Sequence, residues 1–235
     1  LKNENLYLTN RNKLNEPNLF FLDLADFKSI LEFIRHLRLI KFDYIFVNSG
    51  ACLEKDYTKD GIEKNFMINS FSPYYIVKKI TEYQENCTVI LTSSISILKG
   101  QADLNPRHWK HIYRNTKYME HMLFKYLQKM DEKNKYIFAH PGITKSSISY
   151  SLHNLFVRFW ISYFGNSNEA AAEVLVSAMN TKEEVGSWVC PSGLFHLSGT
   201  PKSFKIKRDI PIDDRVVSYV LSLEKDLEEK YKYIE

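Results

Sequence analysis

The sequence has few cysteines and no pattern among them. Cys52, Cys87 and Cys190 are far apart and odd in number. They have neither the spacing of a metal site nor the even count of a disulfide framework, so a reducing, cytoplasmic environment is the simplest expectation. None of the 7 histidines has a neighbouring cysteine or histidine at ligand spacing, so we expect no metal site.

Long apolar runs and blocks of one charge sign are missing as well. No apolar stretch reaches the roughly 18 residues that a transmembrane helix needs, and none reads as a signal peptide. The formal net charge is only +4, and the lysines and arginines form no block, so nucleic acid is not an expected partner. With 44% hydrophobic and 26% charged residues, the composition excludes a disordered chain, a collagen and a coiled coil.

Strand-length apolar runs alternate with segments of helical period. The strands are continuously apolar rather than alternating, which indicates a parallel sheet covered by helices on both faces. No linker or repeat interrupts residues 1–235, so we predict one α/β domain, with ligands beyond the carboxyl ends of the strands. Strands are expected at 5–9, 18–22, 43–47, 88–92, 135–139 and 187–190, and helices at 27–39, 62–83, 108–130, 168–179 and 213–231.

Two details of this pattern are more local. Pro73 predicts a kink or a helix start inside the 62–83 helix, because proline lacks a backbone N–H. The stretch between Cys190 and the last helix reads as a polar connection.

Tyr113 and Lys117 are four residues apart on an expected helix, so both project from one face. An ammonium about 4 Å from a phenol favours the phenolate by roughly 4 kcal/mol at an effective dielectric near 20. That would lower the tyrosine pKa from about 10 toward neutrality and allow proton exchange. The pattern alone is weak, because about one or two matches are expected by chance. Two further pairs match it, Tyr74 with Lys78 and Tyr75 with Lys79.

The surrounding motifs separate Tyr113 from the other two tyrosines. VILTSS at 89–94 is a strand that ends in Ser93-Ser94, YRNTK follows at 113–117, and HPG follows the next strand at 140–142. In this order the chain resembles the short-chain dehydrogenase/reductase family.

Upstream segments extend the resemblance. VNSGA (47–51) is similar to the family's turn after its fourth strand, with Val47 and Ser49 as departures. DGIEKNFMIN (60–69) is similar to the segment that ends in the family's helix-kink asparagine, and LDLAD (22–26) to the end of its third strand. The resemblance covers residues 5 to 146, and its layout favours the retinol-dehydrogenase-like branch.

The resemblance implies a role for each matched residue. Tyr113 would be the general acid and base, and Lys117 would lower its pKa and hold the nicotinamide ribose. Ser94 would hydrogen-bond the substrate oxygen, and Asn69 would hold a water in a proton relay to Lys117. The residues that would line the cofactor are Asp23, Leu24, Asn48, Ser49, Gly50, Tyr113, Lys117, Pro141, Gly142, Ile143 and Ser146.

Local structure offers a plainer interpretation of several of these residues. Ser93 and Ser94 could simply cap a strand end, and Asn69 could kink its helix without a catalytic part. Asp23 could be a turn residue or a helix N-cap, which does not exclude the other role. His140, which precedes a proline, reads as a turn residue more readily than as a base.

Arg11 bears on the choice of cofactor. In dinucleotide folds an acid at the end of the second strand binds the ribose 2′-hydroxyl, whereas an arginine accommodates a 2′-phosphate. Here that strand ends in Thr9-Asn10-Arg11 with no acid, and arginine pairs well with phosphate. NADP(H) is therefore expected rather than NAD(H), although a solvated loop arginine would look the same.

Two further segments concern substrate and partners. Residues 147–166 hold the position of the family's substrate lid, and their aromatic side chains suggest a small apolar carbonyl or alcohol substrate; packing on the core is an equal alternative. Residues 211–235 would form a C-terminal helical extension. The side chains that could form a homodimer face, or equally belong to the core, are Tyr118, Met122, Phe124 and Leu127.

The family's glycine-rich turn does not occur in the sequence. None of the 8 glycines forms the G-x-x-x-G-x-G pattern that brings the backbone close to a pyrophosphate at a helix N-terminus. The family's first strand is central, and its loss would leave two unpaired edges. Because the chain starts at Leu1, where the family's first helix should end, we expect about 30 upstream residues in the working protein.

The residues and the resemblance together predict a Rossmann-like doubly wound parallel sheet that lacks its first strand and helix. The predicted function is that of an NADP(H)-dependent oxidoreductase that interconverts a carbonyl and an alcohol by hydride transfer. The alternative is a non-catalytic scaffold or nucleotide sensor without a phosphate-binding loop.

Overall fold

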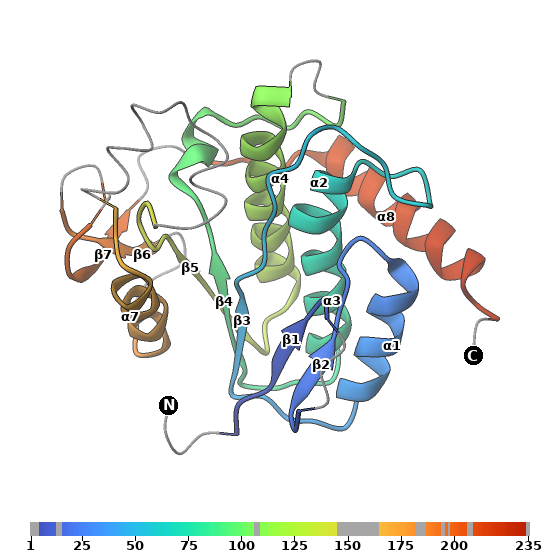
Figure 1. Cartoon of the computed structure of the whole chain (residues 1–235), viewed down its shortest axis with the longest axis horizontal. Helices are drawn as coiled ribbons and strands as arrows, with labels where there is room; N and C mark the ends of the chain where they lie inside the picture. Colours follow the sequence, from blue (N-terminus) through green and yellow to red (C-terminus); the bar gives the residue numbers. More distant parts are fainter. Residues whose placement is uncertain are drawn as a thin grey trace.

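A five-stranded sheet forms the centre of the structure (Figure 1). The computed structural model describes residues 5–12, 16–105, 109–144, 165–181, 187–193, 196, 198–205 and 209–233. The strands lie in the order β3 (Tyr44–Val47), β4 (Thr88–Thr92), β5 (Lys135–Ala139), β6 (Ser187–Pro191) and β7 (Pro201–Lys205). The first four strands are parallel, so the predicted parallel α/β sheet is confirmed.

Strand β7 is a correction to the sequence analysis, which assigned its residues to a polar connection. It pairs antiparallel with β6 at the edge of the sheet. Its sequence, PKSFK, has a single large apolar residue, Phe204. Edge strands need no continuous apolar run, which is why periodicity missed it.

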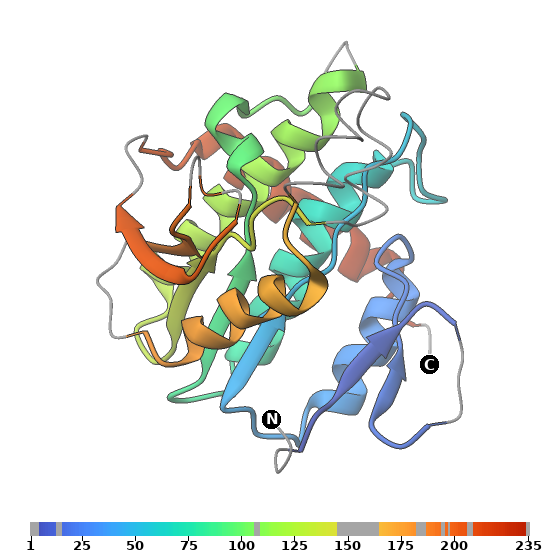
Figure 2. The ribbon, with the colours of Figure 1, turned by 60° about the vertical axis from the view of Figure 1, so that its left-hand side comes forward.

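Helices cover both faces of the sheet (Figure 2). In β4, Val89 and Leu91 face the larger core, and Ile90 faces a smaller one that contains Val174 and Ala178. Both faces of this strand are buried, which accounts for its unbroken apolar sequence. The larger core lies under α1 (Phe27–Leu37), α3 (Ser72–Thr81), α4 (Trp109–Met130) and α8 (Asp214–Lys230), and the smaller core under α7 (Asn168–Met179).

The helical stretch before Pro73 is irregular, as the sequence predicts. It runs from α2 (Lys64–Phe66) through a π-helical segment η1 (Met67–Phe71) into α3. Pro73 has no N–H to donate to the carbonyl of Asn69, one turn earlier. Ser72 N donates to Met67 O, five residues back, which is the hydrogen bond of a π-helix. This π-helical turn contains the buried side chain of Asn69.

The first two strands do not join the large sheet. β1 (Leu8–Asn10) and β2 (Leu19–Phe21) form a separate parallel pair, and both views place β1 between β3 and β2 (Figures 1 and 2). Among the described residues, no strand pairs with the second edge of β1 or of β3. Phe46 of β3 is 36% exposed, although its register partner Ile90 is fully covered.

Helix α8 covers α3 and α4. Both oxygens of Glu224 accept from Lys78 Nζ at 2.7 Å, and Lys79 Nζ lies 3.4 Å from the same carboxylate. Val220 and Leu227 pack into the larger core. The side chains that the sequence offered as a dimer face or as core are all buried in this core: Tyr118, Met122, Phe124 and Leu127.

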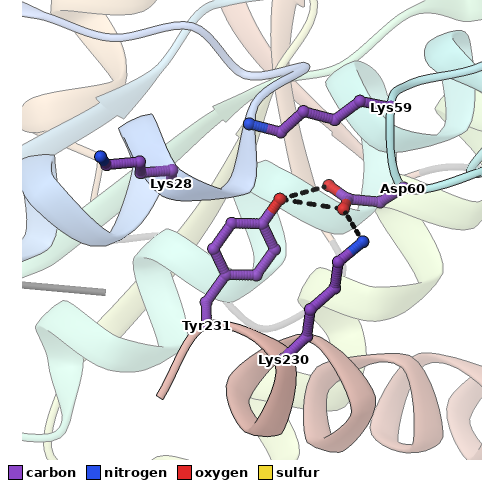
Figure 3. A pocket seen from close by; sticks show the side chains of 5 residues that line it. All are labelled: Lys28, Lys59, Asp60, Lys230 and Tyr231. Carbon is purple, nitrogen blue, oxygen red and sulfur yellow. Dashed lines mark hydrogen bonds and ion pairs between the residues drawn. The ribbon is translucent and has the colours of Figure 1, made fainter. Parts of the chain in front are cut away.

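A polar cluster fixes the far end of α8 (Figure 3). Lys230 Nζ donates to Asp60 at 2.6 Å, and the Tyr231 hydroxyl donates to the same carboxylate at 2.9 Å. Lys59 Nζ pairs with Asp26 at 2.7 Å. Each of these cations has its own carboxylate, so the cluster is an anchor for the helix.

Among the described helices, none combines the length and apolarity needed to cross a membrane.

We expect Glu224→Gln to lower the free energy of unfolding by roughly 1–3 kcal/mol, because it leaves Lys78 and Lys79 incompletely paired. Urea unfolding measures the change. Asp226→Asn, on the exposed side of α8, is the matched control and should change the value by less than about 0.5 kcal/mol. Equal effects of the two substitutions would contradict the anchoring role of Glu224.

Candidate active site

The carboxyl ends of β3, β4 and β5 meet at one edge of the sheet. Asn48, Ser49 and Gly50 follow β3, and Thr92 Oγ1 at the end of β4 donates to Asn48 Oδ1 at 2.8 Å. Ser93 N, just beyond β4, donates to the carbonyl of Ala139 at the end of β5. The three strand ends are therefore tied together, at the edge where parallel sheets bind ligands.

Ser94 begins the 3-10 helix η2 (Ile95–Lys99) and caps it. Its Oγ accepts from Ser96 N at 3.2 Å and from Ser96 Oγ at 2.9 Å. The capping interpretation of Ser94 therefore describes the structure. The same side chain also lies close enough to Tyr113 of α4 to lower the pKa of its phenol, which places two hydroxyls near each other beyond β4.

Lys117 lies one turn along α4 from Tyr113 and reaches the same strand end. Its Nζ donates to the carbonyl of Thr92 at 2.9 Å, and the residue is only 4% exposed. The structure thus brings Ser94, Tyr113 and Lys117 together at the carboxyl end of β4.

The pKa of Tyr113 departs from the sequence-based expectation. Burial raises it, and this outweighs the Lys117 ammonium and the Ser94 hydroxyl, which both lower it. A second charge works against Lys117, because the buried carboxylate of Glu120 forms an ion pair with it. The expected fall of the Tyr113 pKa toward neutrality is therefore wrong for this structure.

Glu120 is the residue that the sequence analysis missed. It stands three residues after Lys117 on the same helix, a spacing that places side chains next to each other. The signal was present in the sequence, but an acid within a helix reads as a solvated residue unless its burial is known.

Asn69 holds the turn after β3 against α4. Its Oδ1 accepts from Ala51 N at 2.7 Å, and its Nδ2 donates to Ala51 O at 2.7 Å and to Thr116 Oγ1 at 3.1 Å. The side chain is fully buried in the π-helical segment, one turn before Pro73. This structural role places Asn69 next to the residue that precedes Lys117.

The remaining cofactor candidates of the N-terminal part follow the strands of the small sheet. Arg11 is exposed just after β1, and Asp23 follows β2. Asp23 Oδ1 accepts from Ala25 N at 2.9 Å, so the turn interpretation of Asp23 describes the structure. The carbonyl of Leu24 accepts from Ser72 Oγ at 2.7 Å, which ties this turn to α3.

The turn after β5 has a fixed shape. Gly142 has a φ of +84°, which favours glycine, and Asn166 holds the turn from outside. Asn166 Nδ2 donates to Pro141 O at 2.8 Å, and its N donates to Ile143 O at 2.8 Å. Ser146 lies outside the described residues, as does the expected lid apart from 165–166.

The two competing tyrosine–lysine pairs have a structural role in α3. Tyr74 and Tyr75 are buried, and burial raises the pKa of each. Their partners, Lys78 and Lys79, contact acids of α8. Neither pair lies at a strand end, so position distinguishes Tyr113 and Lys117 from both.

No protein-family model matches the chain. A curated human protein, dehydrogenase/reductase SDR family member 12, is 27% identical over 92 residues, which is 37% of this chain and 29% of the human protein. The chain thus matches less than a third of that relative's length. Over this segment the chain is similar to a member of the short-chain dehydrogenase/reductase family, the same family that the order of its motifs resembles.

Solved structures show the same fold. An uncharacterised protein from Mycobacterium paratuberculosis aligns with a TM-score of 0.61 at 20% identity, over 90% of this chain and 75% of its own. The KRED1-Pglu enzyme gives 0.52 at 12% identity, over 77% and 78%. BdcA in complex with NADPH gives 0.50 at 17% identity, over 68% and 67%.

Behind the strand ends, the chain buries two histidines, His121 and His140. Burial lowers the pKa of His140 to about 4 and that of His121 to about 3. His121 Nδ1 lies 3.5 Å from Ser93 Oγ, and the backbone N of His140 donates to Val189 O. Because burial lowers both pKa values, both imidazoles are neutral near pH 7.

We expect His140 to make the stability fall as the pH falls from about 6.5 to 4. Its folded pKa is below the unfolded value of about 6.5, so the unfolded chain binds more protons in this range. In His140→Asn the slope of unfolding free energy against pH should be smaller, as measured by urea unfolding across the range. His36→Asn, on the exposed side of α1, is the control; an equal loss of slope there would argue against the role of His140.

Proposed function

We propose that the chain is the catalytic part of an NADP(H)-dependent oxidoreductase that interconverts a small apolar carbonyl compound and its alcohol. The observation that supports this most is the meeting of Ser94, Tyr113 and Lys117 beyond β4. Asn69 completes the proposed set from the neighbouring helical segment.

The two hydroxyls define where a substrate oxygen would be held. A carbonyl oxygen between Tyr113 and Ser94 accepts a hydrogen bond from each, which polarises the carbonyl carbon. The nicotinamide cofactor supplies the hydride when it is bound. As negative charge develops on the substrate oxygen, Tyr113 gives up its phenolic proton to it. Lys117 stabilises the phenolate that is left, and a water held near Asn69 returns the proton.

The residues present fit the nicotinamide end of such a cofactor. Asn48 and the turn Pro141–Ile143 lie at the same strand edge as Lys117, and they offer amide, carbonyl and ammonium groups. Lys117 would hold the ribose hydroxyls once its ammonium turns from its present partners. The NADPH complex of BdcA, a protein of the same fold, supports a nicotinamide cofactor.

The phosphate end needs a further element. Pyrophosphate binds best to N–H groups of a glycine-rich turn at a helix N-terminus, and the described residues provide no such turn at this edge. Between β1 and β3, whose facing edges pair with no described strand, and beside the exposed Phe46, there is a position where another strand would pair. We infer that tight cofactor binding requires a strand and a glycine-rich turn in this position.

Tyr113→Phe should lower turnover by about 100-fold or more while leaving the fold intact, because it removes the proton donor. Consumption of NADPH with a panel of aldehydes and ketones measures activity, and circular dichroism checks the fold. Tyr219→Phe, on the surface of α8, is the matched control and should keep full activity. Retained activity in Tyr113→Phe would contradict this mechanism. A wild type that binds NADPH but turns over nothing would favour the non-catalytic alternative.

Arg11→Ala should raise the KM for NADPH by about tenfold and leave the KM for NADH unchanged, because only NADPH has the 2′-phosphate. Steady-state kinetics with both cofactors tests this. Arg38→Ala, just after α1, is the control and should change neither value. A parallel rise for both cofactors would show that Arg11 does not read the 2′-phosphate.

A further inference from the structure

A buried carboxylate lies against the lysine of the proposed site. Glu120 is 0% exposed, and its Oε2 pairs with the ammonium of Lys117. The same ammonium donates to the Thr92 carbonyl at 2.9 Å. Among the described residues, no further hydrogen-bond donor reaches either oxygen of Glu120. Within the described part of the chain, Lys117 is therefore the one group that compensates this carboxylate.

Tyr113, Lys117 and Glu120 form a stripe on one face of α4. The intervals of four and three residues correspond to two helical turns, so the lysine lies between the phenol and the carboxylate. The charge of Lys117 lowers the pKa of Tyr113, and the charge of Glu120 raises it. The two effects oppose each other at the same hydroxyl.

Two further titratable groups, His121 and Cys52, interact with this stripe, and neither carries a charge near neutral pH. His121 faces Lys117, and its pKa is lowered to about 3 by burial and by Lys125 and Lys117. Cys52 faces Tyr113, and burial raises the pKa of its thiol. The charges that act on Tyr113 within the described site therefore come from Lys117 and Glu120.

We propose that Glu120 is a positioning residue that holds the ammonium of Lys117 at the end of β4 and cancels its charge, so that Tyr113 stays a phenol and the site favours carbonyl reduction. The preference for reduction rests on the proposed function, whereas the cancellation of the Lys117 charge by Glu120 is independent of it.

The direction follows from the proton balance. In reduction, the phenolic O–H bond of Tyr113 breaks and its proton joins the substrate oxygen, while a hydride from the cofactor adds to the carbonyl carbon. In oxidation, a phenolate must exist first to accept the alcohol proton, and the charge of Glu120 opposes it. Burial raises the pKa of Glu120 to about 7, so the carboxylate is ionised in the alkaline range where phenolate would form. The equilibrium constant of the reaction is unchanged.

The direct test is the titration of Tyr113 in the full chain, read from phenolate absorbance as the difference between each protein and its own Tyr113→Phe version. We expect Glu120→Gln to lower the pH midpoint on the order of one unit and Lys117→Met to raise it. Glu132→Gln, an exposed acid beyond the end of α4, removes the same charge from the chain and should not move the midpoint. An unshifted midpoint in a folded Glu120→Gln protein overturns the proposal.

Glu120→Gln leaves a buried lysine without its partner, and this variant could fail to fold for that reason. A double variant then keeps the test decisive. Glu120→Gln with Lys117→Met has neither charge. If the two charges cancel in the native protein, its midpoint matches the wild type. If Glu120 has no influence, the midpoint matches Lys117→Met alone, and the proposal is overturned.

Failure of this inference and failure of the proposed function can be told apart. The titration needs neither substrate nor cofactor, so it decides the role of Glu120 even where no substrate is turned over. With an active wild type, alcohol oxidation in Glu120→Gln should rise at a pH lower by about one unit. A fall in melting temperature without a shift of the pH profile would show a purely structural residue.

Discussion

The parallel pairing of β4 with β3 and β5 is the constraint on which the rest of the structure depends. It buries both faces of β4, with Val89 and Leu91 toward one core and Ile90 toward the other. It also aligns three strand ends, so that the polar residues beyond them share one edge. α4 is long enough to pass along the larger core and still bring Tyr113 to that edge.

Much of the fold could be predicted because buried strands and helix faces need apolar residues at regular positions in the sequence. The strands at 88–92 and 135–139 and the helix at 168–179 have the predicted bounds, since their apolar patterns begin and end sharply. The helix predicted at 62–83 is instead three joined segments, α2, η1 and α3. The π-helical segment η1 lies just before Pro73, which has no backbone N–H to donate. Strand β7 escaped prediction because antiparallel edge pairing needs only backbone groups.

The sequence could indicate which candidate residues share one strand end, but it could not indicate their electrostatics. The order of motifs pointed to Ser94, Tyr113 and Lys117, and the structure brings them together. The sign of the Tyr113 pKa shift depended on how deeply the site is buried and on Glu120, and neither can be read from a four-residue spacing. Asn69 shows the same limit, because its three hydrogen bonds join segments that are far apart in sequence.

The separation of the two sheets has a consequence for how the molecule opens. Among the described strands, none of the unit of β1, β2 and α1 pairs with the five-stranded sheet. Phe27 of α1 instead packs at a tilt against Phe71 and Tyr75, with ring centroids 6.2 and 5.0 Å apart. Side-chain packing therefore holds this unit to the rest of the molecule, and no ladder of backbone hydrogen bonds between described strands has to break when the two separate. Amide hydrogens of this unit will therefore exchange with solvent through a sub-global opening of lower free energy than the one that exposes β4 and β5.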